Sequence, residues 1–207
     1  MIFGCWYTSD YAHHVPLLRN SVCERGFDLH RIELKPKEQY PWEHITRAKA
    51  GMAVRIMERN RGKTVVLVDV DAEVVGTRED VLRMADIPGD VGFHVRSLPR
   101  QQSRHRPTRQ LPRSGTMVLR PTSGTARLLD VWREMLEDLP PYEPDETALM
   151  PAICKSCVTL TYLPEGAAWL YGDSGQPIIL HHGAGKRTPR WRRWIGGQMP
   201  WRKIWGK

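Results

Sequence analysis

Residues 65–76 read VVLVDVDAEVVG, and this stretch decides the fold class. Four consecutive apolar residues, 65–68, predict a strand that is buried on both faces, as in a parallel sheet covered by helices. Asp69 and Asp71 follow at the point where that strand ends. Because side chains alternate along extended backbone, we expect both carboxylates on one side of the chain and Val70 on the other.

The two aspartates also occupy an informative position. In an open α/β sheet, ligands gather beyond the carboxyl ends of the strands. Two carboxylates there make an oxygen-rich site for Mg²⁺ or Mn²⁺, whose remaining positions can be filled by diphosphate oxygens and water. The alternative is a solvated turn with two acids, because an Asp-x-Asp pair arises often by chance. The buried-type strand that leads into the pair favours a metal site.

The rest of the chain alternates between strand and helix patterns. Strands are predicted at 2–7, 29–34, 65–68, 91–95 and 114–120, with a last strand pair at 158–163 and 178–181. Helical periodicity runs through 15–22, 45–56, 78–84, 128–136 and 145–153. This alternation predicts a single α/β domain with a mostly parallel central sheet flanked by helices.

Apolar runs in the 207 residues are too short to offer a membrane span. The first residues, 1–7, lack a positive region before their apolar stretch, so they indicate a first strand and not a secretory signal. We therefore expect a cytoplasmic protein.

Positive charge is concentrated in two segments of the chain. Residues 96–113 carry six arginines and no acid, and residues 186–207 carry eight Lys or Arg and no acid, which leaves −6 of the net +8 for the remainder. The first segment is expected to be either disordered or a lid over an anionic ligand. The second holds four of the eight tryptophans, a composition that suits an anionic membrane surface at the inner face, or nucleic acid as the less favoured partner. A packed C-terminal arm is the third interpretation.

Cys154 and Cys157 form a CxxC spacing, whereas Cys5 and Cys23 stand alone. A zinc site would need further cysteines or histidines, and a thioredoxin-like motif opens a helix whereas this one follows a helix. The simpler interpretation is a pair of semi-buried thiols.

Six segments, in the same order along nearly the whole chain, resemble glycosyltransferases of the GT-A type, most closely family 8. These segments are WYTSDYA at 6–12, RAK at 47–49, VVLVDVDAEVVG at 65–76, SGTMVL at 114–119, DETAL at 145–149 and ILHHGAGK at 179–186. Ser114 stands where the family usually has Asn, and Glu146 where it usually has Gln.

The resemblance implies a role for each matched position. Asp69 and Asp71 would hold the metal ion, Mn²⁺ or Mg²⁺, together with a histidine, and Asp69 would also contact the donor. The strand that ends at Leu180 favours His181 over His182 as that ligand. Asp145 and Glu146 would face the donor sugar as the catalytic pair. The remaining donor-binding positions implied by the resemblance are Tyr7, Thr8, Asp10, Arg47, Lys49, Ser114, Gly115 and Lys186.

The sequence thus predicts a GT-A domain over residues 1–188 and a basic, Trp-rich tail over 189–207. The expected activity is transfer of a sugar from a nucleoside-diphosphate donor, UDP-linked by expectation, to a hydroxyl on a glycan, lipid or other acceptor. The alternatives are a nucleic-acid-binding module that uses the Arg-rich segment and the tail, and a metal-dependent phosphohydrolase that uses the same two aspartates.

Overall fold

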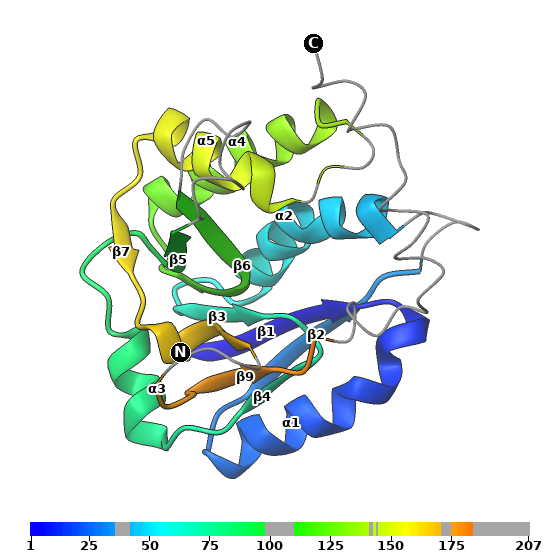
Figure 1. Cartoon of the computed structure of the whole chain (residues 1–207), viewed down its shortest axis with the longest axis vertical. Helices are drawn as coiled ribbons and strands as arrows, with labels where there is room; N and C mark the ends of the chain where they lie inside the picture. Colours follow the sequence, from blue (N-terminus) through cyan, green and yellow to red (C-terminus); the bar gives the residue numbers. More distant parts are fainter. Residues whose placement is uncertain (36–41, 98–109, 141–142, 144, 171–174, 184–207) are drawn as a thin grey trace.

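A six-stranded sheet lies at the centre of the fold (Figure 1). The structure is a computed structural model that describes residues 1–35, 42–97, 110–140, 143, 145–170 and 175–183. The strand order is β2 (Leu29–Glu33), β1 (Ile2–Tyr7), β3 (Val65–Val68), β6 (Gln110–Leu119), β5 (Val91–Ser97) and β7 (Leu160–Tyr162). Only β6 runs antiparallel to its neighbours, β3 and β5, within this sheet. The predicted mostly parallel α/β sheet is confirmed.

Helices cover one face of this sheet, and helices with a small second sheet cover the other (Figure 1). Alternation along β3 explains how one strand serves both cores: Val65 and Leu67 pack with the first, Val66 and Val68 with the second. The first core is completed by α2 (Trp42–Arg59), α4 (Ser123–Glu137) and α5 (Glu146–Ser156). The second is completed by α1 (Val15–Glu24), α3 (Arg78–Ala85) and the small sheet.

The small sheet corrects one prediction. The expected last strand pair, 158–163 with 178–181, does not form, because β7 pairs in parallel with β5 in the large sheet. The other strand, β9 (Ile179–His181), instead lies between β4 (Ala72–Val74) and β8 (Trp169–Leu170). Strand β4 follows the aspartates directly, so its pairing with β9 brings a distant part of the chain beside them.

Both ends of the Arg-rich segment 96–113 belong to strands. Arg96 pairs with Leu111 and Ser97 with Gln110, so β5 and β6 run closer to the segment's centre than the sequence predicted. Arg113 is buried, and its guanidinium Nη1 donates a hydrogen bond to the Ala168 carbonyl at 2.7 Å. The lid prediction now concerns 98–109, which lie outside the described residues.

The C-terminal tail, 189–207, and Lys186 also lie outside the described residues, so the boundary near residue 188 stays a prediction. Two 3₁₀ helices, η1 (Ser9–His14) and η2 (Glu165–Ala168), complete the elements of the described residues. Within the part of the chain that the structure describes, no helix is long and apolar enough to span a membrane.

Candidate metal and donor site

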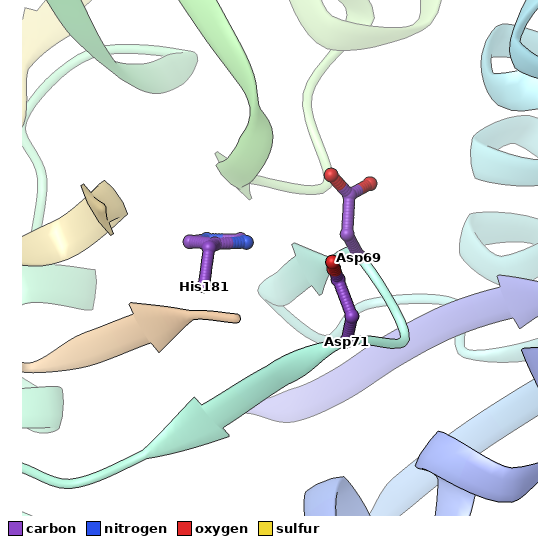
Figure 2. Close-up of side chains that lie close together, drawn as sticks. All are labelled: Asp69, Asp71 and His181. Atoms are coloured by element: carbon purple, nitrogen blue, oxygen red, sulfur yellow. The ribbon is translucent and has the colours of Figure 1, made fainter. Parts of the chain in front are cut away.

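Asp69, Asp71 and His181 converge at the carboxyl end of β3. Figure 2 shows the two aspartates on the turn that leaves β3, with the His181 ring directed toward them from the end of β9. One ligand atom from each residue lies within 4.8 Å of the others. The predicted ligands, which are 110 residues apart in sequence at Asp71 and His181, are thus brought together by the pairing of β4 with β9, which sets Ala72 opposite His181.

An irregularity in the pairing of β6 lies beside this site. The register between β5 and β6 changes from Phe93 opposite Met117 to His94 opposite Arg113, so residues 114–116 have no partner on β5. On its other side β6 stays paired, because the Asp69 amide donates to the Gly115 carbonyl at 2.9 Å. A β-bulge of this kind re-aims side chains beside functional sites.

Gly115 permits the close approach of the metal-site residues. A Cβ added there would lie 3.0 Å from His181 Cε1 and 3.1 Å from Asp69 Oδ2. Either contact is tighter than a methyl group normally tolerates, so a larger residue would push the imidazole and the carboxylate apart. Close packing against His181 and Asp69 therefore explains why the SGTMVL segment has a glycine at this position.

Thr116 orients the His181 ring. Its Oγ1 lies 2.8 Å from His181 Nε2, and both residues are buried. This threonine was missed by the sequence analysis, although side-chain alternation along the strand sets it on the same side as Ser114.

His182 belongs to a different pair. Its Nε2 lies 2.9 Å from Glu73 Oε2, and its backbone amide donates to the Asp71 carbonyl at 3.0 Å. His182 directly follows β9, and its ring contacts Glu73 whereas the His181 ring contacts Thr116, so the two histidines have separate surroundings. The geometry groups His181, and not His182, with the aspartates.

Lys49 joins the metal cluster to a second group of polar residues. Its ammonium lies 2.8 Å from Asp69 Oδ1 and 3.6 Å from Asp145 Oδ2. It also donates to Ser114 Oγ at 3.0 Å and lies 3.3 Å from the Ser114 carbonyl. An ammonium has three hydrogens, so these contacts saturate it.

Asp145 and Glu146 begin α5 beside this lysine. Asp145 is only 4% exposed, and its carbonyl accepts a hydrogen bond from the Trp132 indole at 3.2 Å. Glu146 Oε1 accepts a hydrogen bond from the Ser114 amide at 3.1 Å. The two positions that depart from the family pattern, Ser114 and Glu146, therefore contact each other.

Electrostatics differ among the acids of the site. Burial acts to raise the pKa of Asp69, but Lys49 and His181 outweigh it, and the pKa lies below the usual range. Burial and the neighbouring Asp145 raise the pKa of Glu146 to about 7. Asp69 is thus ionised at neutral pH, whereas Glu146 can hold or release a proton there.

The pKa values of Lys49 and His181 are shifted in opposite directions. Burial acts to lower the pKa of Lys49, but Asp145 and Asp69 reverse this and the pKa is raised, so the amine stays charged. Burial lowers the pKa of His181 despite the nearby Asp69 and Asp71, so its ring is neutral at neutral pH. A neutral imidazole is the form that binds a metal ion.

Four further residues predicted to bind the sugar donor have different surroundings. Tyr7 is the last residue of β1, the buried Thr8 follows it, and Asp10 is exposed in η1. The Thr8 hydroxyl has no hydrogen-bond partner among the described residues. Arg47 is directed to the Pro140 carbonyl, so Lys49 and not Arg47 is the basic side chain in the cluster.

Neither a family model nor a curated protein matches the sequence. The structure, however, resembles several solved glycosyltransferases. One is involved in glycosylation of the major capsid of PBCV-1, with a TM-score of 0.65, 10% identity, and coverage of 96% of this chain and all (100%) of that one. The mouse xyloside xylosyltransferase 1 gives 0.56 at 12% identity, with 91% and 99% covered.

The galactosyltransferase LgtC, solved with donor and acceptor sugar analogs, gives a TM-score of 0.55 at 8% identity, with 95% of each chain covered. Likeness at this level of identity shows the fold. The chain has the fold of GT-A-type glycosyltransferases, and that part of the resemblance seen in its sequence is confirmed.

Proposed function

We propose that the chain is a metal-dependent glycosyltransferase that moves a hexose or related sugar from a nucleoside-diphosphate sugar, UDP-linked, to a hydroxyl acceptor. The observation that carries the proposal is the grouping of Asp69, Asp71 and His181 at the carboxyl edge of the sheet in a fold shared with glycosyltransferases. A glycan or a lipid would supply the hydroxyl.

The three proposed metal ligands fit Mn²⁺ or Mg²⁺. Two carboxylates supply the hard oxygen ligands that both ions prefer. An imidazole ligand is better suited to Mn²⁺ than to Mg²⁺. In the tautomer whose Nε2–H donates a hydrogen bond to Thr116 Oγ1, Nδ1 keeps a free lone pair. Nδ1 lies on the side of the ring beside Gly115 and Asp69. The bound ion would neutralise the charge that develops on the departing diphosphate.

The residues beside the metal site would bind and orient the donor. Lys49 holds the carboxylates of Asp69 and Asp145 in fixed positions and offsets part of their negative charge. Thr8 is buried beside the end of β1, and its role in nucleotide binding is proposed from the sequence resemblance. Lys186 would add a second cation at the diphosphate, as the sequence resemblance implies.

Asp145 and Glu146 would face the sugar at the start of α5. An inverting reaction needs a carboxylate that removes the proton of the acceptor hydroxyl, whereas a retaining reaction has no such requirement. The pKa of Glu146, raised to about 7, suits proton transfer near neutral pH.

The test is an assay with a panel of nucleotide sugars and Mn²⁺, in which released nucleoside diphosphate is measured with and without sugar or lipid acceptors. We expect release from one donor type, enhanced by an acceptor and abolished by a chelator.

Release of inorganic phosphate without any acceptor would instead indicate a phosphohydrolase. Salt-sensitive binding of nucleic acid without turnover of any donor would favour the nucleic-acid module. Either result would reject the proposal.

A peripheral location is a further part of the proposal. We propose that the tail, 189–207, attaches a cytoplasmic enzyme to the anionic inner face of a membrane, where a lipid or glycan acceptor could be reached. Its support is the sequence composition alone.

A further inference from the structure

Two cysteine thiols lie one helical turn apart at the end of α5, on the opposite end of the helix from Glu146. Cys154 belongs to the last turn and Cys157 is the C-cap residue. Both are exposed, contrary to the semi-buried thiols expected from the sequence. Neither thiol has a part in the proposed transfer reaction.

The backbone holds the two residues at a separation that a disulfide can bridge. Residues up to Ser156 are helical, so the Cα atoms of residues 154 and 157 lie about 5 Å apart by helix geometry. Disulfides span Cα separations of roughly 4.4–6.8 Å. The Cys157 amide donates to the Cys154 carbonyl at 3.4 Å, which closes this turn.

The Cys157 side chain is directed back along the helix. Its backbone is in the left-handed region, at φ 51°, and its Sγ lies 3.9 Å from the Cys154 carbonyl oxygen. The Cys157 thiol therefore lies on the side of the turn that Cys154 begins, within reach of side-chain rotation about staggered rotamers.

The segment between the thiols is anchored on its inner side. Ser156 is buried, its hydroxyl donates to the Ile153 carbonyl at 3.1 Å, and its own carbonyl accepts a hydrogen bond from Arg127 Nε at 2.7 Å. This leaves Cys154 and Cys157 on the solvent side of a fixed turn.

A metal site at the pair is not supported. Within the described residues, the group Asp69, Asp71 and His181 is the one set of three or more His, Cys, Asp or Glu that could hold an ion, and it excludes both thiols. Zinc needs four ligands, and two sulfurs do not complete a site.

We propose that Cys154 and Cys157 are a modification site that forms an intrachain disulfide by exchange with a low-molecular-weight disulfide such as oxidised glutathione. The thiolate of one cysteine attacks the glutathione disulfide, forms a mixed disulfide and releases one glutathione. The second cysteine then attacks the protein sulfur, forms the Sγ–Sγ bond and releases the second glutathione. The two cysteines lose two electrons and two protons, and the glutathione disulfide gains them as two thiols.

The other two cysteines serve as internal controls for the exchange reaction. Cys23 is exposed and the cysteine that precedes it in sequence, Cys5, is buried, so we expect exchange at Cys23 to stop at the mixed disulfide. Cys5 is buried, and burial raises its pKa to about 12, so it should not react.

Lys155 makes the test direct, because trypsin cleaves between the two cysteines. It yields peptides 134–155 and 156–186, each of which contains one cysteine. The full chain is reduced, freed of reductant, exposed to oxidised glutathione, blocked with an alkylating reagent, denatured, digested and analysed by mass spectrometry.

We expect the two peptides to be joined by a disulfide, while Cys23 carries glutathione. In Cys154→Ser, Cys157 should retain glutathione because the resolving thiol is gone, and Cys157→Ser should show the reverse. Cys23→Ser should leave the joined peptides unchanged. Glutathione retained on both residues of the wild-type pair, or an unmodified pair beside a modified Cys23, would overturn the proposal.

Discussion

The two oxygens of the Asp69 carboxylate have different neighbours. Oδ1 lies 2.8 Å from the Lys49 ammonium, whereas Oδ2 lies on the side of Gly115 and His181. One carboxylate can therefore hold a lysine and a metal ion at once. The sequence identified the position of this residue at a strand end, but it could not identify the lysine as its partner.

At the residue scale, we predict that His181→Ala weakens Mn²⁺ binding and that His182→Ala leaves it largely intact. The expected loss for His181→Ala is at least about tenfold, since it removes one of three protein ligands. Mn²⁺ titration followed by electron paramagnetic resonance measures the affinity directly.

His182→Ala is the matched control, because the His182 side chain contacts Glu73, and its backbone hydrogen bond to Asp71 is kept in the variant. A loss of affinity in His182→Ala with none in His181→Ala would show that the wrong histidine had been assigned.

A second residue-scale prediction concerns Glu146 and pH. Its pKa is raised from 4.5 to about 7 in the folded chain. A raised carboxyl pKa favours the folded state below the unfolded pKa, and this contribution is lost as pH rises toward 7. Glu146→Gln cannot ionise, so relative to wild type it should gain on the order of 1–3 kcal/mol of unfolding free energy between pH 4.5 and pH 8.

Urea unfolding of both proteins at several pH values, with a chelator present, measures this difference. A stability difference that does not vary across that pH window would contradict the raised pKa.

At the element scale, the site depends on pairings that local sequence patterns do not reveal. The segment at 72–74 is only three residues long as a strand, and its partner β9 lies more than 100 residues further along the chain. Hydrophobic periodicity predicted most helices and buried strands, because each has its own local pattern. It could not predict which of two late strands would enter the large sheet, since pairing is a tertiary choice.

Lys49 connects four elements: its own helix α2, the end of β3, strand β6 and the start of α5. We predict that Lys49→Met lowers the unfolding free energy by about 3 kcal/mol, because it leaves Asp145 buried without its cation. Asp69 contributes less to this cost, since its side chain is 38% exposed.

Adding Asp145→Asn to Lys49→Met should recover much of that stability by removing the uncompensated charge. Denaturant unfolding of the single and double variants provides the test. A double variant as unstable as Lys49→Met alone would reject the role of the ion pair.

At the scale of the whole molecule, the net positive charge comes from two segments, and the remainder has a net negative charge. Residues 186–207 carry eight cations with four tryptophans, whereas the chain outside the two basic segments has a net charge of −6. Sequence composition alone predicts an anionic partner here, and the described residues do not include the tail.

We predict that truncation after Pro189 abolishes binding to anionic vesicles and preserves hydrolysis of the donor sugar, since Lys186 is retained. At about 1 kcal/mol per cation near an anionic surface, half of the tail charges would give measurable attachment that salt weakens. Vesicle co-sedimentation measures it, with neutral vesicles as the control. Equal sedimentation of truncated and full-length protein would reject the anchor, and loss of folded protein would favour a packed arm.

The proposed function requires that Asp71 is needed for turnover. The decisive measurement is Mn²⁺-dependent release of nucleoside diphosphate from the best donor by wild type, Asp71→Asn and Asp130→Asn. Asp130 is the matched control, an exposed aspartate on α4 that pairs with Arg133. We predict a loss of at least about 100-fold in Asp71→Asn with unchanged unfolding, and wild-type rates in Asp130→Asn. Wild-type turnover in a folded Asp71→Asn protein would contradict the proposed metal site.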